Sequence, residues 1–335
     1  MSPIAGRVDS QVIETFKNEI RAVTKLCDGS HPNIIRVFTS GLLRPTLSLF
    51  FIDMQYCEGN LKDYLAGQNV GDLPLLPMET RAEQVTHLLK EVIRPILSGL
   101  EFIHSNNEVH RDFTPTNRRS PFDVWLIAVL YSSNDGTWKI ADFGLSSPGY
   151  TSQSVATLKG RGGPCYRPPE LLREVPDPSY TKKLDIWAVG CILYEVCVGK
   201  KLFSGDRATL IFALERKEVE VDLNDLVEEQ RESIRRAIKS ALQINPSDRP
   251  SVNDLMKLVN IGLCPKYLSN PSIKTDHSAS LSPIDNITDR CPSIKTDHSA
   301  DLSPIEGVVD RYPPLSLSDA NRLTCVYCWT QGQKV

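Results

Sequence analysis

The sequence predicts an α+β fold in which a small part containing β-strands precedes a larger, mostly helical part. Two β-like stretches, Ile34–Phe38 and Leu47–Met54, lie near the N-terminus and are separated by glycine and proline. An apolar stripe at three- and four-residue steps then covers Val85–Ile103, and further helical spacing continues to Ile261. Hydrophobic residues make up 41% and charged residues 24% of the chain, which is an ordinary globular balance.

The expected elements follow in order along the chain. A helix is expected over Gln11–Leu26, because its apolar side chains recur on one face. The sequence His31-Pro32-Asn33 ends it, since proline cannot continue a helix. Pro95 interrupts the Val85–Ile103 stripe and predicts a kink there. Short β-like pieces are expected between Val109 and Gly144. The remaining helical patterns cover Asp185–Val198, Arg207–Glu218, Leu226–Gln243 and Val252–Ile261.

The character of the sequence changes after Leu263, where apolar periodicity stops and Pro, Ser, Asp and Thr dominate. The stretch Pro271–Ala279 recurs unchanged as Pro292–Ala300, so the tail contains a tandem repeat whose offset is 292 minus 271, or 21. Two copies are too few for a solenoid. Residues 263–335 are therefore predicted to form a disordered tail. A single C-x-x-C pair in this tail, Cys325-Val-Tyr-Cys328, has no second pair or nearby histidine and is not interpreted as a zinc site.

Bulk properties exclude several classes of partner. A formal net charge of -3 argues against broad binding to nucleic acid or to membrane surfaces. No apolar run reaches the ~20 residues that a membrane-spanning helix needs. The nine cysteines are odd in number and scattered, as is typical of reduced thiols. Residues Met1–Ser10 do not resemble a signal peptide. We therefore expect a cytoplasmic or nuclear protein with neither nucleic acid nor membrane as a partner.

Three motifs carry the chemistry. His110–Asn117 reads His-Arg-Asp-Phe-Thr-Pro-Thr-Asn and fits the H-R-D-x-x-x-x-N catalytic loop of protein kinases. Asp142-Phe143-Gly144 fits the metal-binding turn, and Pro168-Pro169-Glu170 stands where the family has Ala-Pro-Glu. With all three in the family's order, the sequence resembles the eukaryotic protein kinase superfamily, of serine/threonine type, from about Val12 to Ile261. Tyr56–Gly59 looks like the corresponding phrase in fungal members.

The resemblance implies a protein kinase-like fold with a mostly helical C-lobe and a truncated β N-lobe. Residues 1–53 would be the remnant of the N-lobe, with one regulatory helix and two strands. Residues 54–262 would form the hinge and the C-lobe, and 263–335 would follow as the tail. The implied activity is transfer of the ATP γ-phosphate to a hydroxyl group of a protein substrate.

By the same resemblance, Asp112 would accept or orient the substrate hydroxyl, because phosphoryl transfer needs alignment more than covalent help. Asn117 and Asp142 would bind Mg²⁺, since hard oxygen ligands suit that ion. Backbone groups of Gln55 and Cys57 would contact adenine at the hinge. The implied cofactors are therefore ATP and Mg²⁺.

Other residues have implied structural or regulatory roles. Glu19 stands at the place of the helix glutamate that pairs with a strand lysine, and Arg111 would bind a phosphate on the activation segment. His110 and Phe143 would stack in the regulatory spine, and Gly144 would complete the metal-binding turn.

Three more residues have implied anchoring roles in the C-lobe. Asp185 begins the buried helix that anchors the catalytic loop in the family. Glu170 and Arg249 would form a buried ion pair, which is costly to break from one side.

The sequence also departs from the family's pattern. No glycine-rich loop and no strand lysine precede Glu19, so we expect two N-lobe strands with unpaired edges. Thr114 replaces the usual lysine two residues after Asp112, and Gly163 replaces the threonine common before Pro-x-Tyr. The gap from Asn117 to Asp142 is 142 minus 117, or 25, which is longer than in the family.

This gap suggests an insertion at Arg118–Ala128. It is interpreted as a retained intron or splicing variant, with an ordinary loop as the rival interpretation. Three functions stay open on the sequence alone. The first is an active serine/threonine protein kinase, the second is a pseudokinase or protein-interaction module, and the third is an inactive truncated gene product.

Overall fold

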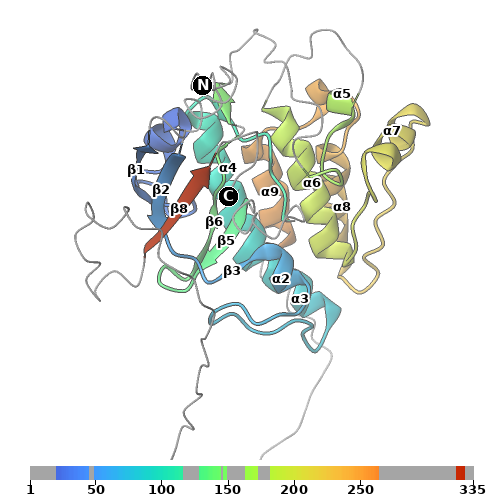
Figure 1. The fold of residues 1–335 in the computed structure, drawn as a ribbon. Coiled ribbons are helices and arrows are strands. Elements are labelled where there is room, and N and C mark those ends of the chain that lie inside the picture. The colour runs from blue at the N-terminus through green and yellow to red at the C-terminus, as the bar shows by residue number, and fades with distance from the viewer. Residues whose placement is uncertain are drawn as a thin grey trace, which may run out of the picture. The chain divides into compact units, whose positions relative to one another are not determined.

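The computed structural model describes residues 20–44, 49–115, 128–144, 146–148, 163–172, 182–263 and 322–328. The chain divides into two compact units, one made of Met1–Leu268 with Asn321–Val335 and the other of Ser269–Ala320. All described residues belong to the first unit, and the duplicated segment of the tail lies outside them. This unit is α+β, as the sequence predicts, with small sheets followed by a mostly helical part (Figure 1).

The first sheet has the order β1-β2-β8 and is antiparallel throughout. Its strands are β1 (Val37–Arg44), β2 (Leu49–Gln55) and β8 (Arg322–Cys328). Strand β2 matches the predicted stretch, but β1 begins later than predicted. The reason is that Ile34 bridges to Ile140 in a different sheet, so the chain joins β2 only from Val37 onward.

The prediction of a disordered tail over 263–335 is wrong for Arg322–Cys328, because these residues form strand β8. The composition of the tail as a whole is polar, so it gives no indication of the short segment near its end whose residues favour a strand. In Figure 1 the red β8 arrow lies beside β2. The edge of β2 that was expected to be unpaired therefore has a neighbour.

Two further small sheets hold the loops of interest. One has the order β3-β5-β6, with β3 (Gly59–Asn60), β5 (Val129–Ser132) and β6 (Thr137–Ile140). The other pairs β4 (Glu108–Val109) with β7 (Ser147–Pro148). Strand β4 directly precedes His110, and β6 directly precedes the loop that carries Asp142. The sheets thus fix the starting points of both candidate catalytic loops.

The predicted helix over Val85–Ile103 is one continuous helical run with an internal irregularity. It consists of α3 (Arg81–Leu88), a π-helical turn (Leu89–Ile93) and α4 (Arg94–Ser105). Thr80 and Glu83 form a capping box at its start. Pro95 stands in the first turn of α4, so the irregularity precedes it, consistent with the proline's missing N–H donor.

One further helix precedes the first sheet, and the other remaining helices belong to the C-terminal part. A helix covers residues 20–26, and the others are α2 (Leu61–Leu65), α5 (Pro169–Leu172), α6 (Lys183–Val198), α7 (Asp206–Leu214), α8 (Glu228–Ala241), a 3₁₀ turn (Pro246–Asp248) and α9 (Val252–Gly262). Helix α7 is shorter than predicted, while α6, α8 and α9 agree with prediction to within about two residues.

Helix α6 forms the centre of the helical part. It is apolar on nearly every side, and Ile186, Trp187 and Val189 are almost fully buried. It packs against α8, where a Cβ added to Gly190 would lie 2.9 Å from the Ala241 Cβ. Absence of a side chain at Gly190 therefore permits the close approach of the two helices.

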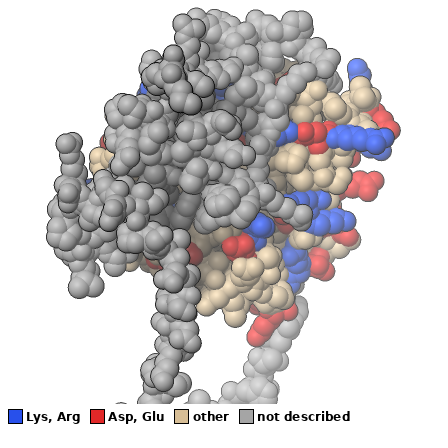
Figure 2. All heavy atoms as spheres, viewed as in Figure 1, with Lys and Arg blue, Asp and Glu red and all other residues tan. Residues whose placement is uncertain are grey.

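The outer surface of α8 is charged. Arg231 pairs with Glu228, and Arg235 pairs with Glu232, each three residues away on the same helix. Figure 2 shows positive and negative side chains interspersed over the described part of the visible face. No helix among the described residues is long and apolar enough to span a membrane.

Candidate active site

The buried start of α6 holds the loop that follows β4. Asp185 is 1% exposed, and its carboxylate accepts backbone N–H bonds from His110 (2.9 Å) and Arg111 (2.8 Å). His104 contacts the same carboxylate at 2.9 Å through Nε2. Burial disfavours the charged carboxylate, but the hydrogen bonds from His104 and from the His110 backbone N–H outweigh it, so the pKa of Asp185 is lowered. The loop is thus fixed by an ionised buried group.

One imidazole joins the two loops that carry the candidate catalytic carboxylates. His110 is fully buried, and its Nε2–H donates to the Ala141 carbonyl at 2.9 Å. Its Nδ1 accepts from the backbone N–H of Asp112 at 3.4 Å. Ala141 immediately precedes Asp142, so a single ring links the backbones beside both aspartates. Phe143 packs edge-on against the same ring, with centroids 5.3 Å apart.

Both loops contain backbone in the left-handed region. Arg111 has φ of 68° and Asp142 has φ of 61°, conformations that non-glycine residues seldom adopt. Such residues persist where the surrounding structure enforces them, and here the bonds to Asp185 and His110 do so. Asn107 and Arg216 are the other non-glycine residues of positive φ in the described part of the chain.

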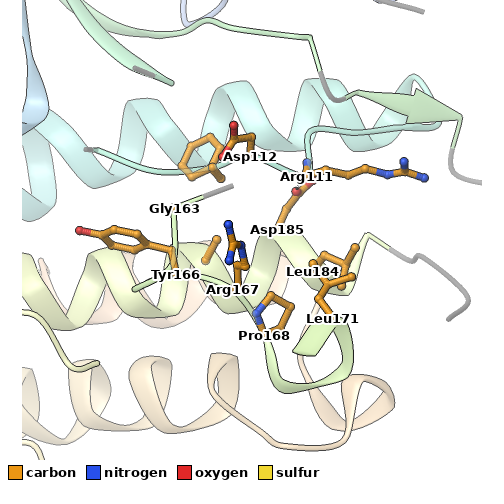
Figure 3. A pocket seen from close by; sticks show the side chains of 11 residues that line it. Arg111, Asp112, Gly163, Tyr166, Arg167, Pro168, Leu171, Leu184 and Asp185 are labelled. Atoms are coloured by element: carbon orange, nitrogen blue, oxygen red, sulfur yellow. Dashed lines mark hydrogen bonds between the residues drawn. The ribbon is translucent and has the colours of Figure 1, made fainter. Parts of the chain in front are cut away.

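A pocket lies between the loop after β4 and the segment that leads into α5 (Figure 3). It is lined by Arg111–Phe113, Gly163, Tyr166–Pro168, Leu171, Leu184, Asp185 and Ala188. In Figure 3 the Arg111 side chain points away from the pocket, and the Tyr166 side chain extends from its other side. Asp112 is thus one of the residues that line this pocket.

A partly buried carboxyl group, Glu195, contacts Tyr166, which lines this pocket. The Tyr166 hydroxyl donates to Glu195 Oε2 at 2.6 Å. Lys201 Nζ lies over the Tyr166 ring, 5.8 Å from its centroid. Burial raises the pKa of Glu195, although Tyr166 and Lys201 act in the opposite direction. Burial also raises the pKa of Tyr166 far above its ordinary value, so the phenol stays protonated and remains a donor.

Thr114 and Gly163, the two residues that differ from the family's motif, lie close together. A Cβ added to Gly163 would lie 2.7 Å from Thr114 Oγ1 and 3.1 Å from Thr114 Cβ, too close without a shift. Thr114 is 4% exposed, so its side chain has little room to move. A glycine at 163 therefore fits a threonine at 114, two residues after Asp112.

The expected hinge follows β2 directly. The Gln55 backbone N–H donates to the Arg36 carbonyl at 2.8 Å, and the Gln55 side chain donates to Ser132 at 3.0 Å. Cys57 is partly buried, and burial raises the pKa of its thiol to about 12, so the thiol stays neutral. The segment Gln55–Cys57 is thereby held between the first two sheets, with the Gln55 N–H already bonded within the protein.

The structure contains the ion pair that the resemblance implies between Glu170 and Arg249. Arg249 has a fully buried side chain that donates to the two Glu170 oxygens at 2.6 and 2.8 Å. Its guanidinium also lies over the Trp187 ring, 4.9 Å from the centroid. The pair ties α5 to the turn before α9.

Sequence reasoning missed a carboxylate beside the site. Glu108 is 1% exposed and sits in β4, two residues before His110. It accepts bonds from both terminal nitrogens of Arg21, one of them at 2.9 Å, and from Lys25 Nζ at 3.1 Å. Arg21 and Lys25 both lie on the helix at 20–26. In the sequence, Glu108 is simply an acidic residue next to an apolar one, and this pattern does not identify Arg21 and Lys25 as its partners.

Some predicted residues lie outside the described part of the chain. These are Glu19, Asn117, nearly all of the expected insertion at 118–128 and most of the activation segment. Gly144 is described and follows Phe143 in the turn after Asp142. Within the described residues no group of three or more His, Cys, Asp or Glu side chains could hold a metal by itself.

Comparisons with known proteins agree with these motifs. Residues 5–259 match the family model described as the protein kinase domain. The chain is 30% identical over 301 residues to the serine/threonine-protein kinase ATG1 of Debaryomyces hansenii, which covers 82% of this chain and 31% of that protein. It is 29% identical over 272 residues to the serine/threonine-protein kinase Nek5 of Homo sapiens, covering 80% and 33%.

A third relative is mitogen-activated protein kinase 4 of Rattus norvegicus, 30% identical over 251 residues, with 69% of this chain and 76% of that protein covered. The chain spans about a third of the length of the first two relatives.

Proposed function

The chain belongs to the protein kinase family, and on this premise we propose that it transfers the γ-phosphate of ATP to a serine or threonine hydroxyl of a protein substrate. The observation that carries the proposal is the link through His110, which binds the backbone beside both Asp112 and Asp142. Asp112 also lines the pocket, and fixed backbones beside both aspartates suit the positioning that phosphoryl transfer requires.

The residues present fit a magnesium nucleotide. Mg²⁺ is commonly held by one or two carboxylates together with phosphate oxygens and water, and it needs no cluster of protein ligands. Asp142 offers a partly exposed carboxylate on a backbone fixed by His110. Asp142, together with Asn117, would hold the ion, which would neutralise the phosphate charge when bound.

The chain's own residues supply positioning and proton transfer. Asp112 would orient the substrate hydroxyl and accept its proton, while Asp185 keeps the Asp112 loop fixed through two backbone bonds. Tyr166 and Gly163 form the opposite side of the pocket, where the residue following the acceptor would lie. Backbone groups of Gln55 and Cys57 would meet the adenine ring.

The direct test measures transfer of labelled γ-phosphate to a mixed protein substrate by the full chain. We expect Mg²⁺-dependent labelling that Asp112→Asn reduces by about 100-fold or more, because the positioned base is lost. Asp225→Asn is the matched control, since Asp225 is exposed and far from the two loops in sequence. Equal labelling by wild type and Asp112→Asn, or none by either, would contradict the proposal.

One observation favours a second candidate function. Thr114 and Gly163 replace a lysine and a threonine that the family uses together beside the catalytic aspartate, and they pack against each other. We infer that a chain with this change could bind a nucleotide and a partner protein without transferring phosphate. Mg²⁺-dependent ATP binding combined with no detectable transfer would identify this pseudokinase function.

A further inference from the structure

The edge of β2 that faces away from β1 is paired with the C-terminal segment. Every residue of β2 is in register with one of β8, from Leu49 opposite Cys328 to Gln55 opposite Arg322. No shift or bulge interrupts this register, whereas the pairing of β1 with β2 has two irregularities. The β2–β8 pairing is thus the more regular half of the sheet.

The position of β2 explains why its second edge needs a partner. An unpaired edge leaves a row of backbone N–H and C=O groups without partners and offers a template for association. β2 contains Ile52, which is 2% exposed, and it leads directly into the expected hinge at Cys57. Fixing this strand therefore fixes the chain just before the nucleotide site.

The segment itself is suited to a strand. Arg322-Leu-Thr-Cys-Val-Tyr-Cys328 contains Thr, Val and Tyr, which favour strands, and no proline or glycine. The preceding tail is rich in Pro, Ser and Asp, which do not. In the register of the two strands, Cys325 stands opposite Ile52 and Cys328 opposite Leu49. The two cysteines of β8 therefore stand opposite two different residues of β2, and either position can report the register.

We propose that Arg322–Cys328 is a constitutive strand of the sheet that carries the hinge, so that the folded kinase unit extends beyond its family match. That match ends at residue 259, well before β8 begins at Arg322. This inference concerns the fold and stands whether or not the chain transfers phosphate.

A disulfide trap in the full-length chain tests the register. Directly opposed residues in an antiparallel pair have Cα atoms about 4.5–5.5 Å apart, within the range of a disulfide. Leu49→Cys should therefore cross-link to the native Cys328 under mild oxidation, in a Cys325→Ser background. The matched control adds Cys328→Ser and Tyr327→Cys, which moves the tail cysteine by one register position.

We expect the cross-link, mapped by mass spectrometry, to form at least ten-fold faster in the in-register variant than in the control. Equal rates, or no intramolecular cross-link in either, would overturn the proposal.

Deletion provides a second measurement that does not depend on cysteine chemistry. Removing residues 321–335 should lower the melting temperature by several degrees, whereas removing an equally long piece of the tail, 285–299, should not. A synthetic peptide of residues 319–331 should restore the melting temperature of the first deletion. Equal melting temperatures for the two deletions would contradict a constitutive strand.

Discussion

At the residue scale, Glu108 shows how a buried charge can organise the neighbourhood of the site. Its two cationic partners come from the helix at 20–26, while Glu108 itself lies two residues before His110. The ion pair therefore connects that helix with the strand leading into the catalytic loop. A buried carboxylate that lost its charge would leave two cations without their partner.

We expect Glu108→Gln to lower the free energy of unfolding by about 2 kcal/mol, because charge-assisted hydrogen bonds become neutral ones. Chemical denaturation of the full chain measures this directly. Glu101→Gln is the control, since Glu101 accepts a bond from Asn253 at a solvent-exposed position and should change stability by less than about 0.5 kcal/mol. Equal effects of the two substitutions would refute the role assigned to Glu108.

The contact between Gly163 and Thr114 gives a second prediction at this scale. Gly163→Ala should destabilise the chain by about 1–3 kcal/mol, because its Cβ would overlap Thr114 Oγ1. In the double variant with Thr114→Ala, the cost should be smaller than the sum of the two single costs. Thermal and chemical unfolding of the four proteins in the cycle measure this coupling, and strict additivity would show that the contact is not close.

The raised pKa of Glu195 predicts a pH dependence. A carboxyl group whose pKa is raised by folding stabilises the folded chain below its ordinary pKa, and this contribution is lost as pH rises through the raised value. Above its raised pKa, ionisation of Glu195 therefore opposes folding.

Glu195→Gln keeps an acceptor for Tyr166 and removes the charge, so we expect it to unfold at a higher temperature than wild type at pH 7. This advantage should vanish below about pH 4. Melting curves between pH 3 and 8 check the prediction, with Glu218→Gln on the exposed surface as the control. An advantage that is constant across pH would mean that ionisation is not its cause.

At the element scale, the close approach of α6 and α8 explains why Gly190 carries no side chain. An added Cβ there would lie 2.9 Å from Ala241 Cβ and 3.0 Å from Leu242. We expect Gly190→Ala and then Gly190→Val to lower stability progressively, with the valine costing about 2–3 kcal/mol or more.

Chemical denaturation of both variants gives the comparison. Gly136→Ala is a useful reference, since nothing lies within 4 Å of its added Cβ and only its φ of 59° is unfavourable. If Gly190→Val cost no more than Gly136→Ala, the two helices would not be in the close contact described.

Elements with strong periodicity were predictable from the sequence, and those defined by distant pairing were not. The buried helix after Asp185 and the amphipathic α8 follow from apolar spacing, and both were placed correctly to within a few residues. The π-helical turn at Leu89–Ile93 has no such signature, although Pro95 pointed to an irregularity nearby. Strand β8 was missed because its partner β2 lies near the opposite end of the sequence, beyond the reach of any local pattern.

The same distinction holds within the candidate site. Motif spacing pointed to His110, Asp112, Asp142 and Asp185 as candidates, because the resemblance implies those residue types in that order. It did not identify Glu108 or the Thr114–Gly163 contact, since each depends on side chains brought together by folding. Thr114 and Gly163 each differ from the family's usual residue, and they lie side by side in the structure. The two differences therefore belong to one local arrangement.

At the scale of the whole molecule, we propose that Asp112 and Asp142 serve one magnesium-nucleotide site with different roles. Their loops are linked through His110 and anchored on Asp185, so both depend on one buried polar network. Asp142 would hold the metal ion, whereas Asp112 would act on the substrate hydroxyl. A binding measurement can separate these roles without a known protein substrate.

The most direct test is equilibrium binding of ATP to the full chain by calorimetry, with and without Mg²⁺, for wild type, Asp142→Asn and Asp112→Asn. We expect Mg²⁺ to strengthen ATP binding at least ten-fold in wild type and in Asp112→Asn. We expect Asp142→Asn to lose this dependence on Mg²⁺. A chain that binds no ATP, or a dependence on Mg²⁺ that survives Asp142→Asn unchanged, would contradict the proposal.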